Sequence, residues 1–407
     1  MTHIFRLSSR WLLLFLSLAI LFTGLMVAAY AIPDRWIAQN TANSIEMLES
    51  EGFNRYMHVG ASDVRMDHFT DRWMLELALR GEEPLLRGAM VPSYTRYWHG
   101  YQVYLRPALV LGDYARLRQW NAVAQITLLC ILAALLAKRL HTVFAALFGI
   151  SLASVCWVVV PFSFQFSSVF LIMLVSTILL LSLYDKPWFR KRLPQFFFVV
   201  GAITVFIDFL TAPILTLGIP LVILLLLRRR DGQETTVGGF KAIFWQGLAW
   251  GSGYASLWAA KWVAASAVLR TNAVGEAVQQ VLFRAGVEST SPENYDLPEM
   301  NGLGARAIAL FRSVDLIVDK RALPVAVVCI LAAGVYLLIR ARKAGFVVSQ
   351  LLPFCAVAAI PFIWLAVLGN QTVIHYYFTY RNLQVSVFAL LAAMGCLWGF
   401  AKEKRNA

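Results

Sequence analysis

The sequence predicts an all-α polytopic membrane protein with about ten transmembrane helices and a long first loop outside the membrane. Three observations support this fold class. Hydrophobic residues make up 59% of the 407 residues and charged residues only 14%, whereas soluble domains are about 25% charged. Apolar runs of roughly 17–25 residues, long enough to cross a bilayer, recur along the chain. The segments between these runs alternate in charge, as they do on the two sides of a membrane.

Ten apolar runs are the candidate transmembrane helices of a single integral-membrane domain. They cover 11–32, 121–138, 142–161, 164–184, 195–211, 213–227, 241–265, 323–340, 347–368 and 383–401. The first run is too long for a signal peptide and has no small-residue cleavage site, so we interpret it as a signal anchor. The fifth and sixth runs are short and interrupted by Asp208, Pro213 and Pro220, which also suits a tight or re-entrant hairpin.

Basic residues are concentrated in alternate connecting segments and near both ends. They are Arg6, Arg10, Lys138, Arg139, Lys186, Arg190, Lys191, Arg192, Arg228, Arg229, Arg230, Arg340, Arg342, Lys343, Lys402, Lys404 and Arg405. The positive-inside rule places these segments, and both termini, on the cytoplasmic side of the membrane. Two long loops, 33–120 and 269–322, then lie outside, while helices two to seven occupy 121–268 and helices eight to ten 323–407. Topology and lipid contact therefore explain the net charge of +13 without nucleic acid.

The first outer loop, 33–120, contains many arginines and acids but no lysine. Arginine suits structured ion pairs and bidentate contacts with phosphate or carboxylate better than lysine does. The apolar spacing and the polar or acidic starts of 41–53 and 70–79 predict short helices along the membrane surface, in preference to strands.

Four charged residues are candidates for chemistry. Asp67 and Asp71 are four residues apart, so on a helix they share one face, where a carboxylate can serve as a general base; the alternative is a helix cap with a first-turn acid. Asp208 lies inside an apolar run, where a carboxylate is costly and is by default a functional hypothesis. Lys261 lies in the outer half of a predicted helix and either reaches toward the interface or meets a phosphate or Asp208.

Two further segments combine cations with aromatic residues: "SYTRYWHGYQVYLRP" at 93–107 and "GNQTVIHYYFTYRNL" at 369–383. Aromatic residues at a membrane surface normally form an anchoring belt. A belt does not explain the embedded Arg and His residues, and aromatic faces with Arg and His donors also suit a sugar and its phosphate, so composition alone leaves belt and site both open. The candidate binding residues are Arg96, Tyr97, His99, His375, Tyr380 and Arg381. We interpret Tyr101, Tyr104 and Pro107 as the anchor.

The layout resembles the GT-C superfamily of polytopic glycosyltransferases, in particular a bacterial subgroup of it. The strings that carry the resemblance are "TDRWM", "RYWHGYQVYLRP", "DFLTAPILTLGIPL", "YASLWAAKW" and "IHYYFTYRNL". The resemblance implies a polyprenyl-phosphate sugar as donor and a catalytic carboxylate in the first outer loop, which best matches Asp67 or Asp71, with Asp34 as the next candidate. It also implies cations near the lipid phosphate, for which Lys261 and Arg381 join Arg96 and His99 as candidates.

The expected reaction is an inverting transfer to a hydroxyl of a cell-envelope glycan, lipid or protein on the extracytoplasmic face. The first outer loop has no Asp-x-Asp or Glu-x-Asp pair, which favours a metal-independent reaction with the lipid-linked sugar as the only co-substrate. Pentofuranose (for example arabinofuranose) and hexose donors both fit. The five cysteines lie in apolar runs without metal-ligand spacing. The alternatives are a transporter or flippase of lipid-linked sugars, for which an internal repeat would be expected, an O-antigen polymerase or ligase, and a non-catalytic scaffold.

Overall fold

The computed structural model describes residues 2–53, 55–59, 62–233, 235–287, 303–317, 323–343 and 345–406, so the second outer loop is described only in part. The protein is mostly helical, as predicted. Helices occupy the predicted apolar runs; they are α1 (Thr2–Tyr30), α6 (Tyr114–Arg139), α7 (Thr142–Ser154), α8 (Phe164–Leu183), α10 (Leu193–Ile207), α11 (Leu215–Arg230), α12 (Thr236–Leu269), α15 (Leu323–Lys343), α16 (Leu352–Val367) and α18 (Gln384–Asn406).

Five segments of the described chain are long and apolar enough to cross a membrane: Ser9–Tyr30, Tyr114–Arg139, Phe164–Leu183, Val348–Val367 and Gly369–Gly399. The helices also expose large apolar side chains to the outside. Examples are Leu13, Ile20, Val123, Val263 and Ile363, each more than 60% exposed. Soluble proteins rarely expose so much apolar surface, so the exterior of the bundle suits a lipid environment.

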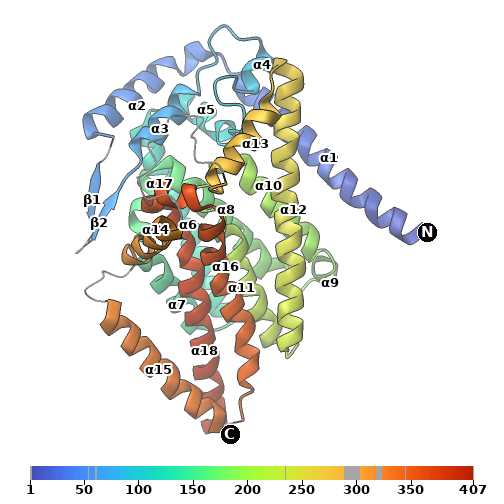
Figure 1. Ribbon diagram of the computed structural model, residues 1–407, viewed down its shortest axis with the longest axis vertical. Coiled ribbons are helices and arrows are strands. Elements are labelled where there is room, and N and C mark those ends of the chain that lie inside the picture. The colour runs from blue at the N-terminus through green and yellow to red at the C-terminus, as the bar shows by residue number, and fades with distance from the viewer. Residues whose placement is uncertain are drawn as a thin grey trace.

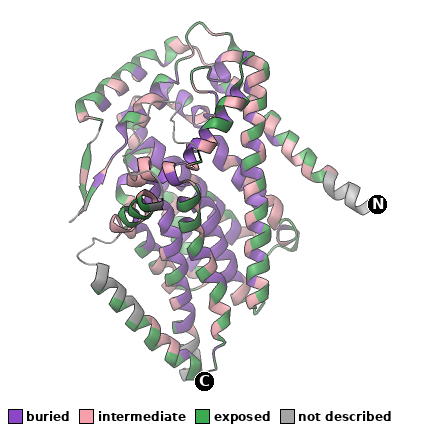
Figure 2. Cartoon of the chain, in the orientation of Figure 1, coloured by how far each residue is buried: buried purple, intermediate pink, exposed green. Residues whose placement is uncertain are grey.

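The centre of the bundle is α11, in which every residue from Leu215 to Leu227 is buried. Figure 2 shows buried residues concentrated along the central helices and exposed ones on the outer flanks. The predicted span 142–161 is not one helix. It ends after Ser154 because Cys156 adopts a left-handed conformation (φ 49°) and Pro161 lies in the 3₁₀ turn that follows.

Helices α10 and α12 pack through two glycines. A Cβ atom on Gly201 would lie 2.1 Å from the Trp250 carbonyl oxygen, and one on Gly253 would lie 2.1 Å from the Phe198 carbonyl oxygen. Small residues of this kind allow the backbones of membrane helices to approach closely.

Substituting Gly253 by valine is expected to destabilise the protein by about 1–3 kcal/mol, because overpacking forces the two backbones apart. Thermal unfolding in detergent measures the effect. Gly251→Val on the same helix is the control, since a Cβ there meets no atom within 4 Å. Equal melting temperatures for the two variants would contradict the close-packing account.

The first outer loop covers one end of the bundle (Figure 1). It contains the predicted short helices, now bounded as α2 (Ala38–Glu51) and α3 (His68–Glu76), together with α4 (Leu85–Ala89) and α5 (Gln102–Leu111). Between α2 and α3 the chain forms a hairpin of two antiparallel strands, β1 (Tyr56–Val59) and β2 (Ser62–Arg65). The sequence did not predict this hairpin. The remaining α-helices of the described chain are the short α9 (Pro187–Arg190), α13 (Ala273–Arg284), α14 (Leu303–Asp315) and α17 (Gly369–Thr379). In the same described residues, four 3₁₀ helices lie at Asp34–Trp36, Trp157–Phe162, Val348–Leu351 and Tyr380–Leu383.

Candidate active site

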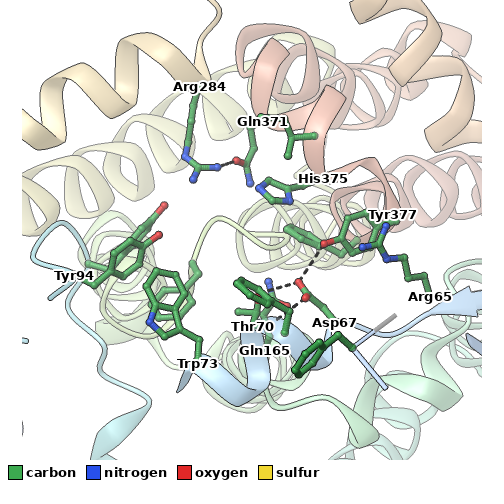
Figure 3. Close-up of a pocket in the computed structure, with 16 residues that line it drawn as sticks. Arg65, Asp67, Thr70, Trp73, Tyr94, Gln165, Arg284, Gln371, His375 and Tyr377 are labelled. Carbon is green, nitrogen blue, oxygen red and sulfur yellow. Dashed lines mark hydrogen bonds between the residues drawn. The ribbon is translucent and has the colours of Figure 1, made fainter. Parts of the chain in front are cut away.

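A cavity of about 420 Å³ lies between the first outer loop and α17. Figure 3 shows side chains from the first outer loop, α13 and α17 converging on it. The lining residues are Phe53, Arg65, Asp67, Phe69, Thr70, Trp73, Tyr94, Tyr97, Gln165, Phe209, Arg284, Gln371, Ile374, His375, Tyr377 and Phe378. Of the residues predicted from the sequence, the cavity therefore contains Asp67, Tyr97 and His375.

Asp67 is both a helix cap and a wall of the cavity. Its side chain accepts hydrogen bonds from the backbone N–H of Thr70 (3.2 Å) and the Thr70 hydroxyl (2.9 Å), which caps α3. The Tyr377 hydroxyl donates a third, longer bond of 3.4 Å from across the cavity. Only 4% of Asp67 is exposed, and burial raises the pKa of its carboxyl group above the usual 3.8, although the Thr70 hydrogen bonds oppose this shift. Asp67 thus caps α3 and lines the cavity at the same time.

Asp71, one helical turn further on, points away from the cavity. It is fully buried and accepts hydrogen bonds from the Tyr114 hydroxyl (2.7 Å) and the backbone N–H groups of Phe164 (3.3 Å) and Gln165 (2.8 Å). Burial raises the pKa of its carboxyl group to about 6. Asp71 therefore joins α3 to the start of α8 and does not line the cavity.

Asp34 is also a structural carboxylate. One oxygen accepts from the backbone N–H groups of Arg80 and Gly81, each at 2.8 Å, and the other pairs with the buried Arg106 at 2.9 Å. Asp34 does not line the cavity. The pair with Arg106 ties the exit of α1 to α5.

The segment around Arg96 and His99 contributes less to the cavity than predicted. His99 is fully buried; its Nε2–H donates to the Tyr94 carbonyl oxygen at 2.7 Å, and its Nδ1 accepts from the Tyr101 hydroxyl at 3.1 Å. Burial lowers the pKa of His99 to about 3, so the ring is neutral. The Arg96 guanidinium stacks 4.0 Å above the Tyr94 ring and lines a neighbouring cavity instead. Neither residue contacts the larger cavity directly.

Three other predicted residues are buried behind the cavity. Lys261 donates from Nζ to the Met90 carbonyl oxygen at 2.8 Å, so it does not meet Asp208. Asp208 accepts from the backbone N–H of Thr211 and closes the turn between α10 and α11. Arg381 is fully buried, 4.0 Å above the Phe166 ring.

Tyr380 also lies away from the cavity, because its hydroxyl donates to the Val155 carbonyl oxygen at 3.3 Å. Of the predicted donor-binding residues, Arg96, His99, Asp208, Lys261, Tyr380 and Arg381 thus lie outside the lining of the larger cavity, whereas Tyr97 and His375 are part of it.

The cations that do line the cavity are Arg65 and Arg284. The Arg65 guanidinium lies 4.1 Å above the Tyr377 ring, and Arg284 donates from Nη1 to the Gln371 side-chain oxygen. Arg284 is 6% exposed, and its Nε has no hydrogen-bond partner among the described residues. The sequence reasoning missed both, although the lysine-free composition of the first outer loop pointed toward an arginine such as Arg65.

A second, smaller cavity of about 50 Å³ adjoins the first and shares Tyr97 and Arg284 with it. Its other walls are mostly apolar; they comprise Arg96, Leu210, Trp258, Ala277, Gln280, Val281, Trp364 and Leu368. Gln280 is 4% exposed, and neither of its amide atoms has a hydrogen-bond partner in the described part of the chain. Arg284 thus lies at the wall shared by the larger cavity, which contains Asp67, and the smaller, mostly apolar one.

The site therefore combines one buried carboxylate, two guanidinium groups, a histidine and several aromatic rings. Gln165 adds a side-chain oxygen that is buried without a partner among the described residues, and a ligand hydroxyl can satisfy it. These groups can bind an anion beside a hydroxyl-bearing molecule and accept a proton from it. No family model matches the chain, and neither a curated protein nor a solved structure matches it.

Proposed function

We propose that this protein is a membrane glycosyltransferase that moves a sugar from a polyprenyl-phosphate donor to a hydroxyl acceptor on the extracytoplasmic face. One observation carries the proposal: the carboxylate of Asp67 and the guanidinium of Arg284 line one cavity that has aromatic walls. The resemblance to GT-C enzymes, with about ten spans and both termini cytoplasmic, supports the same assignment. The acceptor is a glycan, lipid or protein of the cell envelope.

The donor is proposed to bind across both cavities. Its phosphate contacts Arg284, which lies at their shared wall. The apolar residues Trp258, Trp364 and Leu368 of the smaller cavity suit the start of its lipid chain, next to the phosphate. Its sugar then lies in the larger cavity, where Trp73 and Tyr94, whose ring centroids are 4.3 Å apart, provide aromatic surface.

The reaction follows from these positions as a single displacement. Asp67 accepts the proton of the acceptor hydroxyl, and that oxygen forms a bond to the anomeric carbon. The bond between the anomeric carbon and the phosphate oxygen breaks, and polyprenyl phosphate leaves with the electron pair. Arg284 and Arg65 stabilise the negative charge that develops on the leaving group, where the buried setting strengthens their effect. One displacement inverts the configuration at the anomeric carbon.

Purified protein in nanodiscs, supplied with polyprenyl-phosphate pentofuranose or hexose donors, tests the function. Release of polyprenyl phosphate together with an inverted glycosidic product is the expected result. Proteoliposomes test the transporter alternative: a donor that crosses the bilayer chemically unchanged, without release of polyprenyl phosphate, would replace the enzyme proposal with a flippase.

The transfer rate is expected to fall as the pH drops through the raised pKa of Asp67, because only the carboxylate form can accept a proton. Replacing Thr70 by valine removes a hydrogen bond that lowers this pKa, so the acid limb of the pH–rate profile should move to higher pH. Thr70→Ser keeps the hydroxyl and is the control. Coincident profiles for the valine variant and the wild type would show that Asp67 does not control the acid limb.

A further inference from the structure

A groove at the opposite end of the bundle has no role in the proposed reaction. Its volume is about 300 Å³, and it lies where the start of α12 passes the end of α11 and the start of α10. Figure 1 shows that α12 runs the length of the molecule, so its first residues lie far from the outer loop and from α13. This end carries the basic segment Arg228–Arg230.

Two cationic side chains line the groove. Lys241 is exposed and makes no hydrogen bond or ion pair with the described residues. Arg228, on α11, donates to the Gln233 carbonyl oxygen at 3.4 Å and also faces the groove. The capped N-terminus of α12, where Thr235 accepts from the backbone N–H of Gly238, adds the positive end of a helix dipole. Cationic groups therefore lie at the border of a groove whose own surface is mostly apolar.

The remaining walls of the groove are apolar and open to the outside of the bundle. Leu193, Leu224 and Trp245 line it, and Trp245 is 57% exposed. Helix α12 also exposes Phe240 (44%) and Phe244 (61%) near this end, outside the groove lining. Free phosphate makes no favourable contact with apolar walls, whereas acyl chains pack against them. Aromatic residues such as Trp245 also favour the membrane interface.

We propose that this groove binds one anionic phospholipid. Lys241 and Arg228 contact its phosphate, and Leu193, Leu224 and Trp245 contact its acyl chains. Basic pockets between helices on the cytoplasmic side of membrane proteins are suited to such head groups. This inference does not depend on the glycosyltransferase proposal.

Native mass spectrometry of the full chain, released from detergent with added phosphatidylglycerol or phosphatidylcholine, tests the site. We expect one phosphatidylglycerol to be retained in preference to phosphatidylcholine. Each of Lys241→Ala and Arg228→Gln should weaken its binding about fivefold, as expected for loss of one charge near the membrane surface. Lys186→Ala removes an exposed lysine from another basic segment and should leave binding unchanged.

Three outcomes would overturn the proposal. Equal retention of the two lipids would remove the specificity for an anion, and an equal loss with Lys186→Ala would reduce the effect to general surface charge. Displacement of the lipid by inorganic phosphate at equal concentration would identify a site for a free anion. Trp245→Ala adds a further readout, since it should weaken lipid binding without any change of charge.

Discussion

Replacing Asp67 by asparagine is expected to slow glycosyl transfer about 10²- to 10⁴-fold, the usual contribution of a general base, with little effect on folding. Asparagine has nearly the same shape as aspartate and is an equally good N-cap. Its side-chain oxygen can still accept a hydrogen bond from Thr70, as Asp67 does. The amide cannot take the proton of an acceptor hydroxyl, so the chemistry is lost. The Thr70 and Tyr377 hydroxyls, which donate to the second carboxylate oxygen, must turn and accept from the amide N–H groups instead.

The rate of polyprenyl phosphate release and the thermal unfolding temperature should be measured together. Asp63→Asn is the matched control, because Asp63 is an exposed carboxylate in the same loop, paired with His58 outside the cavity. A fully active Asp67→Asn protein with a normal unfolding temperature would refute the assignment of the base.

Replacing Arg284 by glutamine is expected to lower kcat/KM for the lipid-linked donor about 10²- to 10³-fold, the range for loss of one preorganised group that stabilises developing charge. Arg284 is buried at the wall shared by the two cavities. Bulk water therefore cannot stabilise the leaving phosphate in place of the guanidinium. Arg284→Lys should retain part of the activity, because lysine keeps the charge but not the planar, bidentate geometry.

Measuring KM and kcat separately for Arg284→Gln shows whether Arg284 contacts the donor in the ground state or only in the transition state. A rise in KM alone means that Arg284 binds the donor equally in the ground and transition states, whereas a fall in kcat means that it acts on the leaving group. Arg312→Gln is the control, since Arg312 is exposed on α14 and lines neither cavity. An unchanged kcat/KM in Arg284→Gln would remove Arg284 from the site.

The two carboxylates of α3 illustrate what sequence spacing cannot resolve. Asp67 and Asp71 are equivalent by spacing, and the sequence left both base and cap open for the pair. In the fold, Tyr377 from α17 reaches Asp67, whereas Tyr114 and the start of α8 enclose Asp71. These partners are 43 to 310 residues away along the chain, so only long-range packing separates a cavity wall from a buried anchor.

Long-range packing also explains why the cations that line the cavity are not the cations predicted from the sequence. Arg96, His99, Lys261 and Arg381 stand out in the sequence because they interrupt aromatic or apolar runs. Buried polar groups normally have partners, and the partners of these four are mostly backbone carbonyls and aromatic rings, although Nε and Nη2 of Arg381 have no hydrogen-bond partner among the described residues. Arg284 gave no such signal, because it ends an ordinary amphipathic helix, and only the contact with Gln371 brings it to the cavity.

By itself, the sequence determined that the protein is mostly helical, where the apolar helices lie, and that its exterior is apolar, since these properties depend on local composition and on apolar periodicity. It also identified the outer loop that supplies Asp67. Only the tertiary structure decided that Asp67, Arg65 and Arg284 share a cavity, and that Asp34, Asp71 and Asp208 do not. The direction in which a side chain points within a packed bundle depends on its distant neighbours, and no local pattern records them.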